Sequence, residues 1–208
     1  MAYRSFGKAI CAAGSMVALA SCTSASEEAS IDQVRAVAQR YRDVKVAQAE
    51  GYTTDNKCVT AEMLGFPAEL GAMGLHYVRR DMLGLPPKPA TPGGPRVRGT
   101  GTHTDFLRPA MLVYEPQPDG SLQLVAVENL VFAAAWHKNH KEPPSFRGRT
   151  FDLLVDKPET KVDEAHGWEP HYEQHVWVFR DNPNGMLAEF NPRVTCRYHH
   201  PPQTAMKH

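Results

Sequence analysis

Apolar residues recur at helical spacing over residues 30–50, and this stretch carries the strongest helix signal in the chain. The apolar positions fall on one stripe, while charged and amide side chains lie away from it. Ser30 followed by Gln33 fits a capping box, and Gly51 provides a left-handed stop. The pattern predicts one amphipathic helix whose apolar stripe covers a sheet.

Strand signals follow as short runs of β-branched, aromatic and aliphatic residues. Residues 111–115 and 122–132 flank a Pro-Asp-Gly turn, which predicts a hairpin. Further strands are expected over residues 75–78, 151–155 and 172–180. Together these elements predict an α+β fold. We expect a mostly antiparallel curved sheet, cone-like or partly closed into a barrel, packed against the N-terminal helix.

A different pattern marks the first thirty residues as a targeting segment. Arg4 and Lys8 precede an uncharged run from Ala9 to Ala20, which is too short for a permanent membrane span and is typical of a secretory signal. The run ends in Leu-Ala-Ser-Cys22, which resembles the lipobox of bacterial lipoproteins and implies acylation of Cys22. A plain cleaved signal is the alternative. The chain therefore divides into a lipoprotein signal peptide (1–21), a polar tether (22–30), a single globular domain (31–200) and a tail (201–208).

Composition and charge narrow the possible functions. The 208 residues include 42% hydrophobic and 22% charged residues, enough for a packed core. The 23 basic and 23 acidic residues balance, which argues against a nucleic-acid partner. Removal of residues 1–21 would leave 187 residues with a net charge of −2. We expect an exported, membrane-anchored lipoprotein of the bacterial cell envelope. Its partners would be the lipid bilayer, through an N-terminal acyl anchor, and an unidentified small molecule or protein.

The four cysteines fit this division of the chain. Cys11 lies in the signal peptide and Cys22 would carry the lipid, so Cys58 and Cys196 remain for the exported domain. Two cysteines in an oxidising compartment most simply form one disulfide bond. A metal site that uses both cysteines is the alternative.

Ten histidines are present, and three candidate ligands alternate at the start of the last predicted strand. His171, Glu173 and His175 would point to one face of that strand. Residues four apart on a strand are separated by about 13 Å, too far for one ion, whereas residues two apart are separated by about 6.6 Å. The spacing predicts Glu173 and His175 as a chelating pair, with His171 as a weaker candidate.

A third ligand would have to come from another strand. His76, in a short predicted strand, is the natural choice, while His103 and His166 are weaker because they lie in loops. Glu115 and Glu128 stand on apolar strand faces, where a carboxylate is costly unless it is paired or bound to a metal. Glu128 is a weaker candidate for a fourth ligand or a general base.

The predicted ligand set of His76, Glu173 and His175 suits one zinc, copper or iron ion with an open coordination position. Such a site can support hydrolysis or oxidation, and the pattern leaves the activity undecided. In the alternative interpretation these histidines only make hydrogen bonds. The protein would then be a non-catalytic envelope module that binds a small apolar ligand or a protein partner.

Six segments of the chain carry a resemblance to known sequences: residues 41–58, 71–77, 112–116, 171–177, 182–185 and 191–196. Together they resemble a family of uncharacterised exported bacterial proteins and lipoproteins. The resemblance covers most of the chain after the signal peptide. It implies a single exported domain and supports the pairing of Cys58 with Cys196, but it implies no activity or cofactor.

Overall fold

The computed structural model describes residues 28–86 and 96–200. The predicted signal peptide, Cys22, most of the tether and the tail over 201–208 lie outside these residues. Within the described part of the chain, no helix has the length and apolar character needed to cross a membrane.

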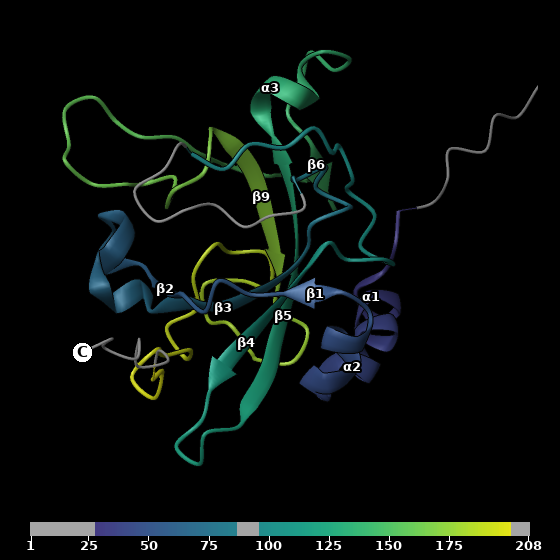
Figure 1. The fold of residues 1–208 in the computed structure, drawn as a ribbon, viewed down its shortest axis with the longest axis vertical. Helices are drawn as coiled ribbons and strands as arrows, with labels where there is room; N and C mark the ends of the chain where they lie inside the picture. The colour runs from purple at the N-terminus through teal and green to yellow at the C-terminus, as the bar shows by residue number, and fades with distance from the viewer. Residues whose placement is uncertain (1–27, 87–95, 201–208) are drawn as a thin grey trace, which may run out of the picture.

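One antiparallel sheet forms the centre of the domain (Figure 1). Its strands follow the order β1-β3-β4-β5-β9-β8, and β2 pairs with β3 on the same side as β1. The bounds are β1 Tyr52–Thr53, β2 Cys58–Thr60, β3 Ala72–Arg79, β4 Met111–Pro116, β5 Leu122–Phe132, β8 Asp152–Leu154 and β9 His171–Val176. The predicted antiparallel α+β architecture is confirmed. No pairing joins β8 to β1 or β2 among the described residues, so the sheet is open and the cone or barrel is not confirmed.

Smaller elements complete the domain. The 3-10 turns η2 (Glu62–Leu64) and η3 (Ala68–Leu70) connect β2 to β3, and α3 (Ala133–Trp136) follows β5. A two-stranded ribbon of β6 (Ser145–Phe146) and β7 (Arg149–Thr150) lies between α3 and β8.

The N-terminal helix is divided into three short pieces, unlike the single helix that the sequence predicts. These are α1 (Ile31–Ala38), η1 (Gln39–Arg42) and α2 (Val44–Ala49). The predicted capping box at Ser30 and Gln33 is present. At Asp43 the backbone leaves the helical region, with φ −88° and ψ 107°, and the carboxylate accepts a hydrogen bond from the Lys45 N–H. Asp43 therefore starts a new helix and ends the old one.

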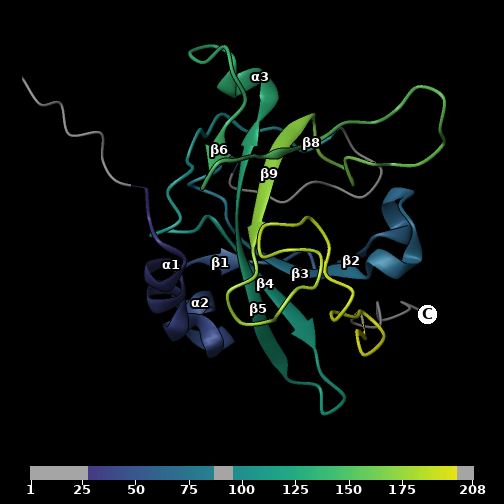
Figure 2. The same ribbon diagram turned by 180° about the vertical axis from the view of Figure 1, so that it is seen from behind.

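The helices cover one face of the sheet and bury the main core (Figures 1 and 2). Val34, Ala38 and Ala47 of the helices pack with buried residues of that face. Those strand residues include Leu75, Tyr77, Leu112, Tyr114, Leu124, Val127, Val131, Tyr172 and Val176. This helix face holds the largest apolar cluster in the described residues, so the fold is stabilised mainly from this side.

A bulge in β5 decides which residues face away from the helices. Tyr114 pairs with Leu124 and Val113 with Ala126, so Val125 is the extra residue. The sequence predicts Leu124 and Glu128 on the same face. The bulge instead turns Leu124 toward the helices and Glu128 toward the opposite face, because one additional residue reverses the alternation of a strand.

Loops cover this opposite face. Figure 2 shows the segment after β9 running across β4 and β5, where the Trp177 Nε1–H donates to the Ala188 carbonyl over 2.6 Å. The Glu115 carboxylate accepts a hydrogen bond from the Thr195 N–H over 3.0 Å and forms an ion pair with Arg180. Glu115 is therefore a buried carboxylate with a structural role in holding the C-terminal segment.

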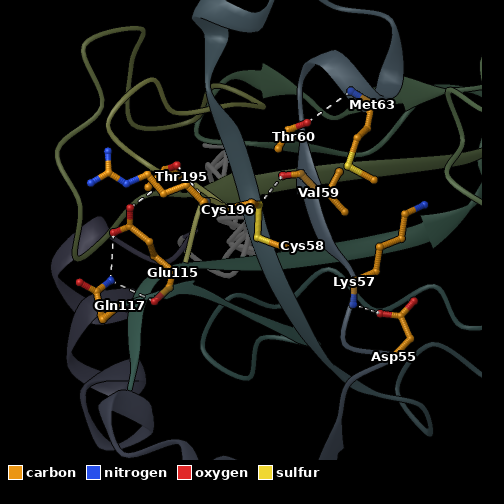
Figure 3. The surroundings of a disulfide bond; sticks show 11 residues. Asp55, Lys57, Cys58, Val59, Thr60, Met63, Glu115, Gln117, Thr195 and Cys196 are labelled. Atoms are coloured by element: carbon orange, nitrogen blue, oxygen red, sulfur yellow. Dashed lines mark hydrogen bonds between the residues drawn. A yellow bond between two sulfur atoms is a disulfide. The ribbon is translucent and has the colours of Figure 1, made fainter. Parts of the chain in front are cut away.

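The predicted disulfide between Cys58 and Cys196 is confirmed. Their Cα atoms lie 5.7 Å apart, and the bond joins residues separated by 138 positions (Figure 3). Because Cys58 pairs with Leu75 on β3, the disulfide ties the C-terminal segment to the strand next to that of His76.

The first described residues lie against the domain. The Glu28 carboxylate accepts a hydrogen bond from the Arg147 N–H over 2.8 Å, and Ala29 packs on the main core. The last part of the predicted tether therefore belongs to the folded domain.

Candidate metal centres

Strands β3, β5 and β9 direct histidine and glutamate side chains to the loop-covered face of the sheet, with β4 between β3 and β5. His76 stands on β3, Glu128 on β5 and His175 on β9. Glu128 and His175 are direct cross-strand partners, which brings their side chains together. We refer to His76, Glu128 and His175 as the first triad.

The ligand atoms of the first triad converge on one point. The His76 Nε2 lies 3.2 Å and the His175 Nε2 3.4 Å from the Glu128 Oε2. One ligand atom from each of the three residues lies within 4.8 Å of the others. The side chains of Glu128 and His175 are 0% and 1% exposed, and that of His76 is 11% exposed. The first triad is thus almost sealed from water.

Most polar atoms of the first triad lack hydrogen bonds. Among the described residues, neither carboxylate oxygen of Glu128 and neither ring nitrogen of His175 has a hydrogen-bond partner. The His175 Nε2 is close enough to the Glu128 carboxylate for an ion pair, but the imidazole and the carboxylate are not aligned for a hydrogen bond. Burial without partners is costly for a carboxylate, and nearly all buried polar groups in proteins are satisfied. A cation at the point of convergence would satisfy the Glu128 carboxylate and the His175 Nε2.

The charge of Glu128 acts on His76. Burial lowers the pKa of the His76 imidazole, but Glu128, with smaller contributions from Glu173 and Asp55, raises the pKa above its ordinary value. The carboxylate therefore favours a positive charge at this position, either a proton or a metal ion.

A second triad lies beside the first and consists of His166, His171 and Glu173. The His171 Nε2 lies 3.2 Å and the His166 Nε2 3.7 Å from the Glu173 Oε2. His171 and Glu173 are buried on β9, and His166 lies in the loop that precedes it with 9% of its side chain exposed. One ligand atom from each of the three residues lies within 4.8 Å of the others.

The residues of the second triad shift one another's pKa values. Burial would raise the pKa of the Glu173 carboxyl, but contacts with His166 and His171 hold it well below its usual range. Burial lowers the pKa of the His166 imidazole, although Glu173 opposes this effect. The second triad therefore combines an ionised carboxylate with an imidazole that gives up its proton readily.

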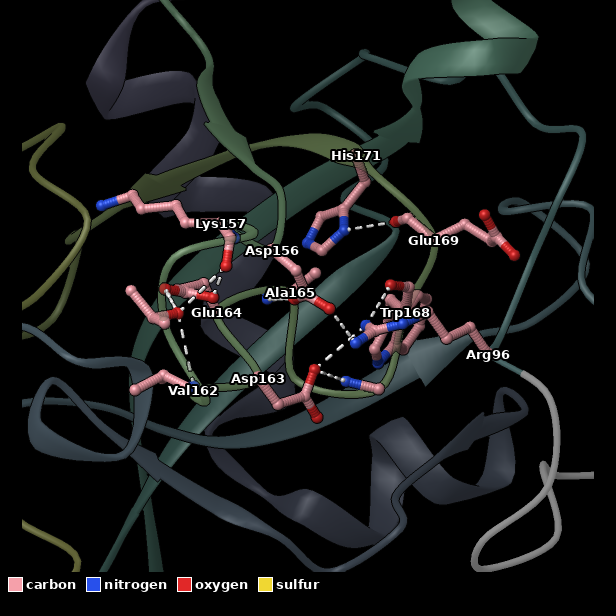
Figure 4. A network of polar contacts seen from close by, with 12 residues as sticks. Arg96, Asp156, Lys157, Val162, Asp163, Glu164, Ala165, Trp168, Glu169 and His171 are labelled. Carbon is pink, nitrogen blue, oxygen red and sulfur yellow. Dashed lines mark hydrogen bonds and ion pairs between the residues drawn. The ribbon is translucent and has the colours of Figure 1, made fainter.

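A network of polar contacts holds the loop that carries His166 (Figure 4). Asp163 accepts a hydrogen bond from the Gly167 N–H over 2.9 Å and forms an ion pair with Arg96 over 3.0 Å. Arg96 also pairs with Asp156 and donates to the Trp168 carbonyl over 2.8 Å. His166 has a left-handed backbone with φ 41°, a conformation that is uncommon for residues other than glycine. The loop thus fixes the direction of the His166 side chain.

A pocket of about 240 Å³ reaches both triads. His76 of the first triad and His166 of the second line its wall, together with Lys57 and the apolar side chains of Met111 and Trp168. The pocket gives solvent and small molecules a route to one residue of each triad.

A further carboxyl group lies near these residues. Burial, and then the negative charges of Glu173, Asp152 and Glu128, raise the pKa of Glu189 to about 8. Glu189 is therefore largely protonated at neutral pH while the triads hold no cation.

The structure groups the predicted ligands differently from the sequence. His76 and His175 lie together, but Glu128 accompanies them, and Glu173 lies with His171. Glu128 is the direct cross-strand neighbour of His175, whereas Glu173 lies two residues along the same strand and is farther away. His171 and His175 belong to different triads, as the length of an extended segment requires. His103 belongs to neither, and its Nε2 hydrogen-bonds to the Arg108 carbonyl oxygen.

No known protein family matches this chain, and neither the curated proteins nor the solved structures include a significant match to it. The geometry of the two triads must therefore carry the functional argument. The resemblance to exported bacterial lipoproteins stays a prediction from the sequence.

Proposed function

We propose that this chain is an exported, lipid-anchored protein of the bacterial cell envelope that binds a transition metal ion through His76, Glu128 and His175. The observation that supports this proposal most directly is the set of buried ligand atoms without hydrogen bonds in the first triad. A metal ion would pair with the carboxylate and accept the lone pairs of both imidazoles.

The donor set limits the choice of ion. Two imidazole nitrogens and one carboxylate oxygen suit zinc, iron or copper better than calcium or magnesium, which prefer oxygen ligands. The three residues come from three strands of one sheet, so the backbone holds them in place without the ion. Three protein ligands leave a coordination position free, where the ion would supply Lewis-acid activation to a bound molecule.

The pocket favours a small molecule as the partner of this ion. His76 lines the pocket wall, so the first triad is accessible from that side. Val97, Met111 and Trp168 form an apolar part of the wall, which also fits a metal-free module for a small apolar ligand. The two functions differ in whether the purified protein retains a metal ion.

Export and anchoring are proposed from the N-terminal sequence. The basic start, the uncharged run and the lipobox-like end at Cys22 support this part of the proposal. The disulfide is compatible with it because disulfide bonds persist mainly in oxidising compartments.

Metal analysis of the purified chain tests the metal-binding function. The full chain, produced without a polyhistidine tag, is loaded separately with zinc, copper and iron, dialysed, and its metal content measured by mass spectrometry. We expect the wild-type protein to retain metal, and Glu128→Gln and His175→Ala to lose the ion of the first triad. The control His140→Ala removes an exposed imidazole outside both triads and should retain the full metal content. A wild-type protein that retains no metal under any loading condition would overturn the proposal.

A further inference from the structure

The second triad repeats the ligand types of the first on the same strand. It consists of two imidazoles and one carboxylate, and Glu173 stands two positions from His175 on β9. Alternate residues of a strand point to the same side, about 6.6 Å apart along the chain. Both triads therefore lie on one face of the sheet, side by side.

The hydrogen bonding of the second triad fits a set of metal ligands. The His171 Nε2 hydrogen-bonds to the Glu173 Oε2 over 3.2 Å, and a metal ion would replace the proton between these two atoms. On its other side, the His171 Nδ1–H donates to the Glu169 carbonyl over 2.9 Å. Metal-binding histidines commonly make this kind of second contact, because it fixes the ring orientation and the tautomer. The Glu173 Oε1 and the His166 Nε2 have no hydrogen-bond partner among the described residues.

We infer that His166, His171 and Glu173 form a second transition-metal site, so that the protein holds two ions side by side under one pocket. This inference rests on the proposed function of the first triad. Because His76 and His166 both line the pocket, one small molecule can reach the open side of both ions. The natural ligand would then be an anion with at least two donor atoms, such as a carboxylate or a phosphate, able to contact two cations at once.

The two sites should differ in their affinity for a metal ion, because their ligands are held in place by different parts of the fold. All three ligands of the first triad lie on strands of the sheet, whereas His166 depends on a loop. That loop is held by the side-chain contacts of Arg96 and Asp163 and by a backbone bridge between Val97 and Trp168. We therefore expect the second ion to bind more weakly than the first.

Titration of the full-length, metal-free protein with cobalt(II) tests the inference. Visible absorption reports the coordination of each ion, and mass spectrometry counts the ions retained after dialysis. The wild-type protein should bind two equivalents in two steps. Glu173→Gln should lose one equivalent and keep the tight one, Glu128→Gln should lose the other, and the double variant should bind none.

In each glutamine variant an NH2 group replaces one carboxylate oxygen and the side chain keeps its volume, which limits the effect of the change on folding. Glu159→Gln, at an exposed position, is the matched control and should bind two equivalents. A single equivalent that Glu128→Gln abolishes and Glu173→Gln leaves intact would overturn the second site while the proposed function stands. A single equivalent lost in both variants would mean one shared ion and would also overturn it. No binding in the wild type would overturn the proposed function itself.

Discussion

In the metal-free protein, the variant Glu128→Gln is expected to raise the free energy of unfolding, although most changes at fully buried positions lower it. The Glu128 side chain is 0% exposed and its oxygens lack hydrogen bonds. An amide nitrogen at the same place can donate to the Nε2 of His175, which lies 3.4 Å from the present oxygen. An unsatisfied buried polar group costs about 1–3 kcal/mol, so we expect a gain of about 1 kcal/mol or more.

With metal present the sign should reverse. Binding to the folded state alone stabilises a protein by about 2.7 kcal/mol when the free ion is at one hundred times its dissociation constant. Glu128→Gln weakens that binding because a neutral amide replaces the charged ligand. The variant should therefore be less stable than the wild type in excess zinc and more stable in excess chelator.

Urea unfolding followed by circular dichroism measures the free energy of unfolding in excess chelator and in excess zinc. The measurements are made at about pH 8.5, which is well above the ordinary imidazole pKa. Glu115→Gln is the matched control, because Glu115 is also buried but is hydrogen-bonded to Thr195 and paired with Arg180. That variant should lose stability equally in both conditions. If Glu128→Gln also lost stability equally with chelator and with zinc, Glu128 would be a structural residue and the argument from unsatisfied atoms would fail.

Three other predictions concern the disulfide, the half-buried Glu189 and the lipobox. Cys196→Ser should lower the free energy of unfolding by about 5 kcal/mol, which is the loop-closure value for a bridge across 138 residues. Peptide mapping of the wild-type protein without reduction should show the bond. A loss of stability below about 1 kcal/mol in the variant would contradict the entropic argument. In the metal-free protein the folded state holds a proton on Glu189 up to a pKa of about 8, whereas the unfolded state releases it near 4.5, so stability is fully present below about pH 4.5 and is lost as the pH rises through 8. This group changes the free energy of unfolding by at most about 1.4 kcal/mol per pH unit. Glu189→Gln should reduce the dependence of the free energy of unfolding on pH, and the control Glu159→Gln should not. The same pH dependence in the wild type and in Glu189→Gln would refute the raised pKa of Glu189. Cys22→Ala should abolish fatty-acid labelling and leave unprocessed precursor, and labelling that persists would show that the lipobox interpretation is wrong.

Local patterns predict the elements of this fold well. The alternation on β9 places His171, Glu173 and His175 on one face, and the Pro-Asp-Gly turn predicts the β4–β5 hairpin. Both signals are short-range, since they depend on the period of a strand and on the backbone preferences of turn residues. The break at Asp43 is less evident, because the apolar stripe continues through it while the backbone does not.

The composition of each triad depends on contacts that no local pattern contains. Glu128 faces His175 because Val125 forms a bulge and because β9 pairs with β5 in one particular register. A bulge is a local irregularity of the strand, and the register is set by residues far apart in the chain. His166 lies in a loop without periodicity, and its direction is fixed by contacts with residues far along the chain, such as Arg96 and Val97.

The contact between Glu28 and Arg147 limits how far the domain can lie from a lipid at Cys22. Six residues of fully extended chain reach about 20 Å, which is less than the thickness of the hydrocarbon core of a bilayer. With an acyl group on Cys22, the domain would be confined to a thin layer above the headgroups and could not sample the depth of the envelope. Whatever enters the pocket would then have to diffuse to a domain that is held beside the membrane.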